Sequence, residues 1–279
     1  MAELYQGKFS GQEIDNRLDN VKRTCRFVIG TSTAGWTEAD CDYLCDGTAD
    51  DVEINAAIQA LPGTGGQILI LDGTYKITAP ITVNKINVTL RGNGTATILQ
   101  RNWDSSTREG VINITAMDGG VTVQNIQIRG EKQSYTNTNN IGIFLKNTQD
   151  NIITGNICNN NSSNGIYLED TQDNSITENT CDGNYRGIYF SNSSNNIVTG
   201  NTCNNNNDGI YLSSSDNNTV TGNTCIRGTG QSSDYTSRQY TIRVQSTQSS
   251  KNLFVGNNIM GKNYTDDGTG NTWANNKYN

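Results

Sequence analysis

The chain has 279 residues, only 33% of them hydrophobic, with a formal net charge of −7 and no histidine. The absence of histidine excludes Ser-His-Asp triads, Cys-His dyads and histidine metal ligands, so any acid–base chemistry falls to Asp, Glu, Arg, Lys or Tyr. An acidic chain without a long basic run lacks the surface of a nucleic-acid binder, and no segment reads as a secretory signal or a membrane span. We therefore expect a protein made in the cytoplasm without a signal peptide, with no cofactor, no metal, no nucleic acid and no membrane partner.

Residues 1–25 are predicted to form an N-terminal attachment or oligomerisation helix. Ser10 and Glu13 have the spacing of a capping box. The apolar residues that follow have the four-then-three spacing of a coiled-coil seam, and they are Ile14, Leu18 and Val21. Such a seam predicts self-association, and we expect a homotrimer.

Residues 26–66 are predicted to be a linker followed by a capping helix. The stretch DDVEINAAIQAL has acids in its first turn, the apolar residues Val52, Ala56 and Ile58, and Pro-Gly directly after it. These features are typical of a short amphipathic helix. Because the open end of a stacked sheet must be covered, we expect this helix to cap the N-terminal end of the domain that follows.

The middle of the chain repeats nearly the same eighteen residues four times, as IGIFLKNTQDNIITGNIC, NGIYLEDTQDNSITENTC, RGIYFSNSSNNIVTGNTC and DGIYLSSSDNNTVTGNTC. The glycine of each unit follows the previous one by 23, 22 and 22 residues. Alternating apolar residues in each unit predict short strands, and a unit this small can bury its inner face only against copies of itself. The sequence thus predicts an all-β fold, a single-stranded right-handed parallel β-helix over residues 67–260, with 261–279 as a C-terminal cap or tail.

Equivalent residues of successive coils should stack into ladders. The inward aliphatic ladders are expected to be Ile143, Ile166, Ile188 and Ile210, with Leu145, Leu168, Phe190 and Leu212. A turn ladder of hydrogen-bonded amides is expected at Asn156, Asn179, Asn201 and Asn223. The cysteine ladder is Cys158, Cys181, Cys203 and Cys225.

The four cysteines of that ladder are best interpreted as small packing residues. No CxxC pair occurs among them, so neither a metal site nor a disulfide is indicated. Cys41 and Cys45 could pair if oxidised, but we expect free thiols there as well.

The stretch CDGTADDVEINAAIQALPGTGGQILILDGTYKITAPITV resembles the opening of the pectate-lyase-like right-handed β-helix superfamily, and the later units resemble its parallel repeats. The resemblance covers about residues 40–260. It implies the fold rather than the function, because the superfamily includes lyases, hydrolases, epimerases and non-catalytic spikes.

The segment SGQEIDNRLDNV is similar to the short N-terminal adaptor helices of phage and prophage tail-associated proteins, whose β-helix spikes are commonly trimeric. This resemblance implies a tailspike-like protein of a virion or tail-like particle. Its N-terminal helix would then dock to other tail proteins.

Two insertions interrupt the repeats, at 129–140 and 226–240, and both follow the second short strand of their coil. We expect them at the same corner, on either side of a groove about 19 Å long, from four strand spacings. The predicted glycan-binding residues of this groove are Tyr185 and Arg186 on its floor, with Arg129, Lys132, Tyr135, Arg227, Tyr235 and Arg238 on its walls. The alternative is that both insertions are tolerated surface loops without a function.

An aromatic stripe is the second candidate site. Phe144, Tyr167, Tyr189 and Tyr211 occupy one position of successive units and are expected on the outer side of one sheet. Such a stripe could bind sugar faces or neighbouring subunits, or it could only shield the strands.

The expected function is recognition of a host-surface polysaccharide by a tail-associated appendage. The alternatives are a polysaccharide lyase or glycoside hydrolase on the same scaffold, and a purely structural connector. In this superfamily a lyase is expected to use Arg or Lys as its base and a hydrolase clustered Asp residues. If the chain is an enzyme, the catalytic candidates are therefore Asp182, Arg186 and Asp208.

Overall fold

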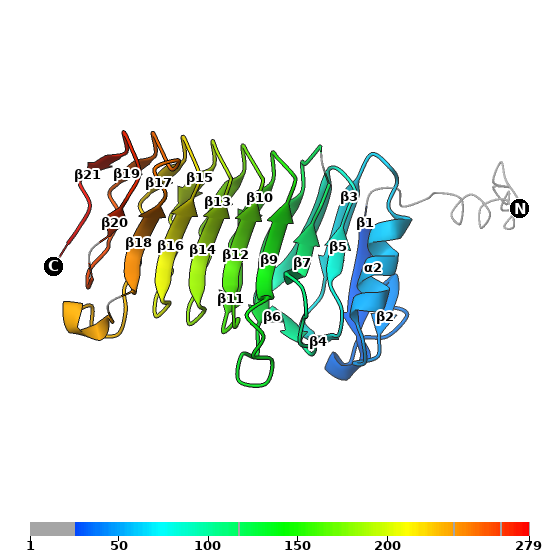
Figure 1. Ribbon diagram of the computed structural model, residues 1–279. Helices are drawn as coiled ribbons and strands as arrows, with labels where there is room; N and C mark the ends of the chain where they lie inside the picture. The colour runs from blue at the N-terminus through cyan, green and yellow to red at the C-terminus, as the bar shows by residue number, and fades with distance from the viewer. Residues whose placement is uncertain (1–25, 117, 237, 263, 279) are drawn as a thin grey trace, which may run out of the picture.

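The computed structural model describes residues 26–116, 118–236, 238–262 and 264–278. The predicted N-terminal helix, with its capping box and its seam, lies outside the described residues. Figure 1 shows the described part as an elongated stack of strands, with the first described strands at one end and the C-terminus at the other.

Two parallel sheets run along the stack, one of 13 strands and one of 8 among the described residues. The larger sheet contains β1 (Arg26–Thr31), β2 (Tyr43–Cys45), β3 (Gly66–Ile70), β4 (Gly73–Ile77), β6 (Val88–Arg101), β8 (Thr122–Arg129), β10 (Ile152–Thr154), β11 (Ile157–Asn159), β13 (Ser175–Thr177), β15 (Ile197–Thr199), β17 (Thr219–Thr221), β19 (Leu253–Val255) and β21 (Thr272–Ala274). The smaller sheet contains β5 (Ile81–Val83), β7 (Glu109–Ile114), β9 (Asn140–Lys146), β12 (Asn164–Glu169), β14 (Arg186–Ser191), β16 (Asp208–Ser213), β18 (Tyr240–Gln245) and β20 (Thr265–Asp266). Helix α2 (Asp51–Ala60) and two 3-10 turns, η1 (Ser32–Ala34) and η2 (Ser232–Asp234), complete the described elements.

Strands one coil apart pair in parallel and in register, which confirms the parallel β-helix. In the smaller sheet Ile166 pairs with Ile188 and Ile188 with Ile210. The predicted aliphatic ladders are confirmed, since all eight side chains are fully buried. Apolar residues of both sheets meet in one core between them, so few apolar residues per coil suffice.

The sheets extend beyond the range predicted for the coil at both ends. Strand β1 pairs in parallel with β3, with Val28 opposite Leu69, although this segment was expected to be a linker. At the other end β21 pairs with β19, with Leu253 opposite Thr272. These outer rungs deviate from the repeated motif, and the sequence period therefore did not reveal them.

Helix α2 lies at the N-terminal end of the stack, beside β1 and β2 (Figure 1), where the sequence predicts it. The predicted apolar face is wrong in part. Ile54, Ala57 and Ile58 are the buried apolar residues, whereas Val52 is 59% exposed. Ile54 and Ile58 are four residues apart and therefore lie on the same face of the helix. This face packs against the core, and Val52 lies outside it.

Each repeated glycine lies opposite the repeated cysteine of its own unit. A Cβ atom added at Gly187 would lie 2.8 Å from Cβ of Cys203, and one at Gly165 would lie 3.0 Å from Cβ of Cys181. Real Cβ contacts are not this short, so neither position tolerates a larger residue without movement. The close approach explains why the glycine and the cysteine recur together.

The burial of the predicted cysteine ladder is confirmed. Cys158, Cys181, Cys203 and Cys225 are free thiols, at most 2% exposed. Burial raises the pKa of Cys181 and Cys203 well above the usual value, which keeps these thiols protonated and unreactive.

In the native protein the four ladder thiols should therefore resist alkylation by iodoacetamide, and all four should react after denaturation. Peptide mapping by mass spectrometry distinguishes them from Cys41, which is partly exposed. Rapid labelling of the ladder peptides in the folded protein would contradict the packing of this core.

Asparagine ladders line the turns between the sheets, and the predicted one is confirmed. Nδ2 of Asn179 donates to Oδ1 of Asn201 at 3.1 Å, and Nδ2 of Asn201 donates to Oδ1 of Asn223 at 3.0 Å. Two further ladders were not predicted. One contains Asn151, Asn174, Asn196, Asn218, Asn252 and Asn271, and the other contains Asn161, Asn184 and Asn206.

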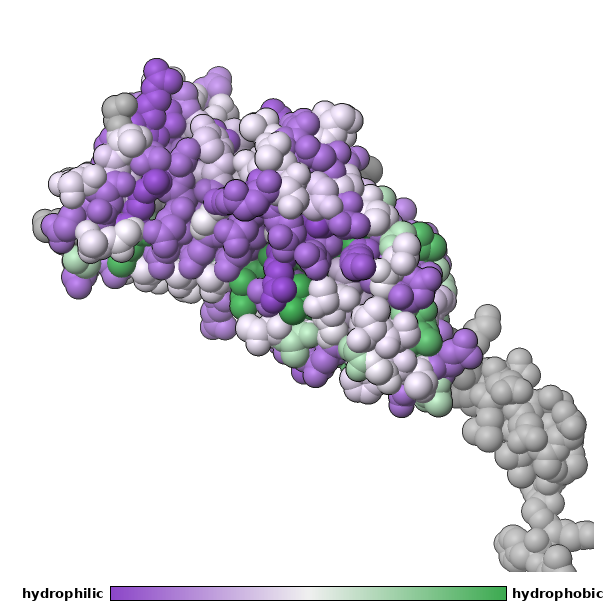
Figure 2. Space-filling model, turned by 90° about the horizontal axis from the view of Figure 1, so that it is seen from below, coloured by the Kyte–Doolittle hydropathy of each residue, from purple (hydrophilic) through white to green (hydrophobic). Residues whose placement is uncertain are grey.

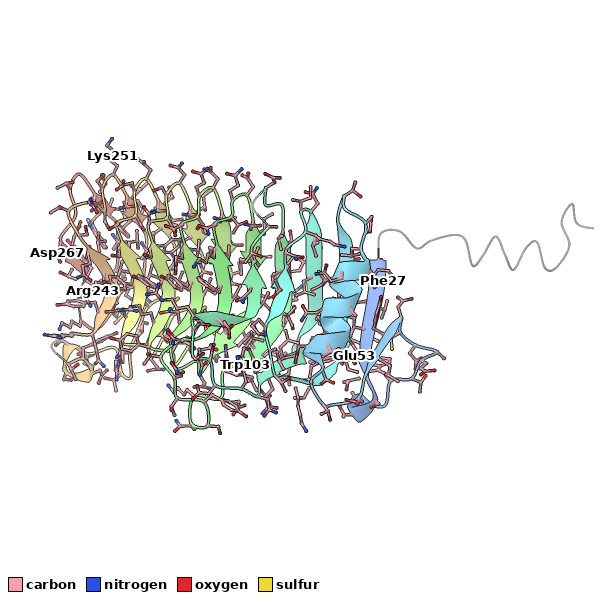
Figure 3. All side chains as sticks on the ribbon, turned by 45° about the vertical axis from the view of Figure 1, so that its right-hand side comes forward. Phe27, Glu53, Trp103, Arg243, Lys251 and Asp267 are labelled. Atoms are coloured by element: carbon pink, nitrogen blue, oxygen red, sulfur yellow. The ribbon has the colours of Figure 1, made fainter. Side chains whose placement is uncertain are left out.

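Side chains project all around the coil, as Figure 3 shows. In that view Lys251 stands at one edge of the stack and Trp103 near the opposite edge. Both long insertions leave the coil at the lower edge of Figure 1, as the sequence predicts. Seen from below, this side is mostly hydrophilic, with hydrophobic surface in separate small patches (Figure 2).

Candidate functional site

A cleft of about 520 Å³ lies on the outer side of the smaller sheet, where the first insertion rejoins the coil. Strands β9, β12 and β14 form its floor, and the end of the insertion and the turn before β14 form its rim. The lining residues are Arg108, Thr138, Asn139, Ile141, Ser163, Asn164, Tyr167, Tyr185, Arg186 and Tyr189.

A second hollow of about 380 Å³ lies at another corner. Its lining is a regular array of amide, hydroxyl and one carboxyl side chain: Asn147, Thr148, Gln149, Asp170, Thr171, Gln172, Asn192 and Ser194. Neither an aromatic ring nor a cation is among these residues. The cleft on the smaller sheet is the richer site chemically.

The predicted aromatic stripe is stacked but not open. Ring centroids are 5.1 Å apart between Phe144 and Tyr167, 4.6 Å between Tyr167 and Tyr189, and 4.8 Å between Tyr189 and Tyr211. Yet Phe144, Tyr167 and Tyr211 are only 5%, 2% and 5% exposed. The register of the stripe is as predicted, and the burial of these rings agrees with the alternative in which they shield the strands.

Arginine side chains cover the stripe. Cζ of Arg186 lies 4.6 Å from the ring centroids of both Tyr189 and Tyr211, and Cζ of Arg243 lies 5.0 Å from that of Tyr211. Figure 3 labels Arg243 on β18. A guanidinium over an aromatic face is attracted by the ring's negative face, so these contacts hold the arginines over the stripe.

Asp208 lies beneath these arginines. Its Oδ2 is 3.8 Å from Nε of Arg186 and 3.6 Å from a terminal nitrogen of Arg243, and the residue is only 2% exposed. Burial raises the pKa of Asp208, while the two arginines oppose that shift. The carboxyl thus positions two guanidinium groups.

Glu169 has the same role at the other end of the cleft. It accepts from Arg108 at 3.0 Å and lies 3.2 Å from Nζ of Lys146. Burial raises the pKa of Glu169, but hydrogen bonds from Tyr167, Lys146 and Arg108 outweigh this and hold it below its usual value. Glu169 is therefore ionised at neutral pH and anchors Arg108.

Of the residues predicted for the corner groove, Tyr185 and Arg186 lie in this cleft. Tyr185 is 47% exposed, and Cζ of Arg186 lies 4.8 Å from the centroid of its ring. Asp182 belongs instead to the turn scaffold, because its Oδ1 accepts the backbone N–H of Asn204 at 2.7 Å. Burial raises the pKa of Asp182, and the bond from Asn204 opposes that rise.

Lys132 and Arg227, from the two insertions, donate to carbonyl groups of the turns. They do not line two sides of one groove. Nζ of Lys132 donates to the carbonyl oxygen of Gly183, and Nη1 of Arg227 donates to that of Asn206 at 3.1 Å. Both contacts fasten an insertion to the corner. Lys132 and Arg227 thus shape the corner and do not line the cleft.

The remaining insertion residues point apart. The hydroxyl of Tyr135 donates to Oδ1 of Asn102 at 2.6 Å, toward the N-terminal end of the stack. The ring of Tyr235 lies against Gly261, toward the C-terminal end, and burial raises the pKa of Tyr235 to about 12. Arg129 and Arg238 are exposed, and the predicted walls therefore do not enclose one continuous groove.

Arg108 and Asn164 are among the cleft residues that were not predicted. Arg108 precedes β7, in a coil that lies before the four repeated units. The repeat period therefore could not predict that its side chain lies on the outer face of the smaller sheet. Asn164 is the residue before the repeated glycine, and its partner in register is Arg186. That position holds Asn, Arg and Asp in successive units. This variation within the repeat was the signal that could have indicated Asn164 as a site residue.

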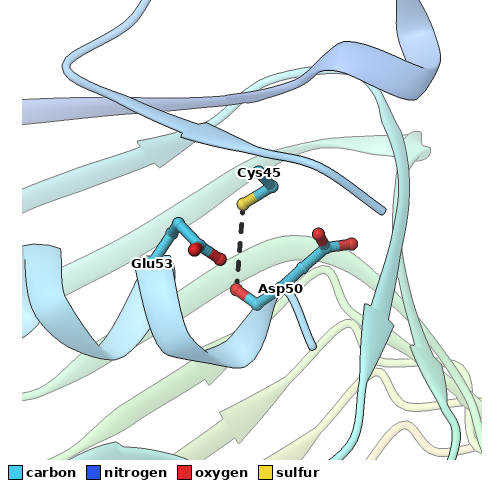
Figure 4. A group of neighbouring side chains, drawn as sticks. All are labelled: Cys45, Asp50 and Glu53. Atoms are coloured by element: carbon cyan, nitrogen blue, oxygen red, sulfur yellow. Dashed lines mark hydrogen bonds between the residues drawn. The ribbon is translucent and has the colours of Figure 1, made fainter. Parts of the chain in front are cut away.

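A group of potential metal ligands lies at the start of α2. Atoms of Cys45, Asp50 and Glu53 all lie within 4.8 Å of one another (Figure 4). Both carboxylate oxygens of Asp50 already accept backbone N–H groups, from Gly47 at 2.8 Å and from Lys76 at 2.7 Å. Sγ of Cys45 lies 3.7 Å from the carbonyl oxygen of Asp50. The group therefore holds the helix start against the sheet.

Residues 70–279 match the protein-family model described as "Periplasmic copper-binding protein (NosD)". A search of curated proteins finds no match.

Solved structures with similar folds come from viruses and bacteria. ORF18 of Geobacillus virus E2 has a TM-score of 0.51 and 18% identity, and the match covers 98% of this chain and 66% of that one. Tailspike protein 2 of Escherichia coli O157:H7 bacteriophage CAB120 has a TM-score of 0.56 and 13% identity, over 84% of this chain and 32% of that one. An alginate lyase from Paenibacillus sp. str. FPU-7 has a TM-score of 0.55 and 14% identity, over 91% and 98%. Such low identities establish the fold alone.

The described residues do not fit the copper site that the family description implies. Copper prefers imidazole, thiolate and thioether ligands, and the sequence has no histidine. The cysteine ladder is buried in the core, where burial keeps the thiols of Cys181 and Cys203 protonated, and the carboxylate of Asp50 is already engaged. The described part of the chain also contains no helix long and apolar enough to cross a membrane.

Proposed function

Given that the chain belongs to the NosD family of parallel β-helix proteins, we propose that it is a phage or prophage tail-associated appendage that recognises a host-surface polysaccharide. The observation that carries this proposal is the cleft on the smaller sheet. It combines an exposed aromatic ring at Tyr185, cationic donors at Arg108 and Arg186, and amide groups at Asn139 and Asn164.

Sugars need this combination, because their C–H faces stack on aromatic rings while their hydroxyl groups both donate and accept hydrogen bonds. The rigid coil places the cleft residues at fixed spacing along neighbouring rungs. Fixed donors and rings reduce the loss of freedom on binding, which favours recognition of an extended polymer.

The structural neighbours support a glycan-related role. A phage tailspike and an alginate lyase use the same scaffold. Trimer formation and docking through the N-terminal helix belong to the same proposal, and light scattering of the full chain would measure the number of copies.

A polysaccharide lyase is the second candidate, because Arg186 stands in the cleft beside the ring of Tyr185. A glycoside hydrolase is less well supported. Its two carboxyl groups must face the sugar from about 5 to 9.5 Å apart, whereas Asp208 is buried under two arginines and Asp182 accepts a backbone N–H. Release of unsaturated uronates, followed by ultraviolet absorbance, distinguishes cleavage by a lyase from binding.

Replacing Tyr185 with alanine is expected to weaken binding to polysaccharide purified from the host surface at least about tenfold, because exposed aromatic anchors carry much of the energy of such contacts. Thermal unfolding should hardly change, since the side chain is half exposed. Affinity is measured by calorimetry. The matched control is Tyr278→Ala, since Tyr278 is 40% exposed at the far C-terminal end. Equal affinities of wild type and Tyr185→Ala would contradict the proposed site.

A further inference from the structure

The cleft has an excess of positive charge that the chain as a whole does not share. Glu169 is shared by Arg108 and Lys146, at 3.0 and 3.2 Å. Asp208 is likewise shared by Arg186 and Arg243, at 3.8 and 3.6 Å. Four cations thus face two carboxylates, an excess of two positive charges in a chain whose net charge is −7.

Each of the two groups presents one guanidinium to the cleft. Arg108 and Arg186 line it, while Lys146 and Arg243 do not. The side chains of Arg108 and Arg186 are 61% and 21% exposed, so both guanidinium groups can be reached from the cleft. A planar guanidinium donates two parallel hydrogen bonds to a carboxylate, with a stronger attraction than to a neutral hydroxyl.

Asn164 adds an unused acceptor. The residue is only 3% exposed, it lines the cleft, and its Oδ1 has no hydrogen-bond partner among the described residues. A buried acceptor without a partner is costly, and a ligand hydroxyl would satisfy it. It lies in register with Arg186 on the neighbouring strand, so a hydroxyl and an anionic group of one ligand could be bound together.

We propose that the cleft recognises a sugar unit that bears a carboxylate, such as a uronic acid within a polysaccharide, through Arg108 and Arg186, with Asn164 accepting one of its hydroxyl hydrogen bonds. This inference rests on the proposed function and narrows it to acidic polysaccharides. Tyr185, at the rim, supplies the ring for the sugar's C–H face.

The test measures binding of the full chain to alginate, polygalacturonate and hyaluronan, to the same polymers after reduction of their carboxyl groups to alcohols, and to neutral dextran. The reduced polymers keep the ring and linkage and lose only the charge. We expect at least one acidic polymer to bind about tenfold or more tightly than its reduced form. In Arg108→Gln this preference should fall severalfold, and in Asn164→Leu both forms should bind more weakly.

The matched control is Arg91→Gln, which removes the same charge from an exposed position on β6 and should leave the preference unchanged. If an acidic polymer and its reduced form bind equally, or if only dextran binds, the inference of acid recognition is wrong while polysaccharide binding stands. If none of these polymers binds, the inference fails, while binding to polysaccharide purified from the host surface decides the proposed function. The inference is also wrong if Arg91→Gln and Arg108→Gln lose the preference to the same degree. The effect would then reflect the overall charge of the protein rather than the cleft.

Discussion

Replacing Asn201 with leucine is expected to lower the free energy of unfolding by about 4 kcal/mol, because several buried groups lose their partners at once. Oδ1 of Asn201 accepts from both the backbone N–H and the amide of Asn179, at 3.0 and 3.1 Å. Its amide donates to the carbonyl of Ile176 at 2.8 Å and to Oδ1 of Asn223. Leucine has a similar size but satisfies none of these groups.

Urea denaturation of the variant measures this loss. The control is Asn84→Leu, because Asn84 is exposed and water can replace the hydrogen bond that its Oδ1 accepts from Gln59 at 3.1 Å. That change should cost less than about 0.5 kcal/mol. Similar losses in the two variants would show that the amide ladder does not stabilise the coil.

Replacing Gly187 with alanine is expected to cost about 3 kcal/mol or more, because the added methyl group has no space. Its Cβ would lie 2.4 Å from the backbone oxygen of Gly209, 2.8 Å from Cβ of Cys203 and 2.9 Å from Nδ2 of Asn206. Two of these atoms belong to the next rung and the third to the buried cysteine. Relief therefore requires that neighbouring coils move apart.

The loss is again measured by denaturation, with Gly63→Ala as the control. No atom lies within 4 Å of a Cβ built at Gly63, so alanine there should have little effect. If Gly187→Ala unfolds like the wild type, the close approach of glycine and cysteine does not explain why they recur together.

The repeat period made the interior predictable. Because Ile166, Ile188 and Ile210 recur at a constant interval, each lies above the last in the stack. Successive side chains of a strand point to opposite faces, and the apolar ones are therefore assigned to the core. The amide ladder follows from the same period. Asn174 and Asn196 form another ladder, and the same reasoning could have found it.

The cleft was less predictable, because its shape depends on residues that the period does not relate. Alternation places Tyr167 on the outer side of its strand, but it does not say that Arg108 reaches over it from an earlier coil. The direction of each insertion depends on single contacts, such as that of Lys132 with the carbonyl of Gly183. The sequence therefore pointed to Tyr185 and Arg186 as candidates, and the structure places both in the cleft on the smaller sheet rather than between the two insertions.

The most direct test of the proposed site is hydroxyl-radical footprinting of the full chain, with and without a saturating polysaccharide that it binds. Tyr185 is 47% exposed and Tyr278 is 40% exposed, so both should be oxidised in the free protein. We predict that the polysaccharide reduces oxidation of Tyr185 severalfold and leaves that of Tyr278 unchanged. Unchanged oxidation of Tyr185, with protection appearing instead at Tyr235 or elsewhere, would contradict recognition in this cleft.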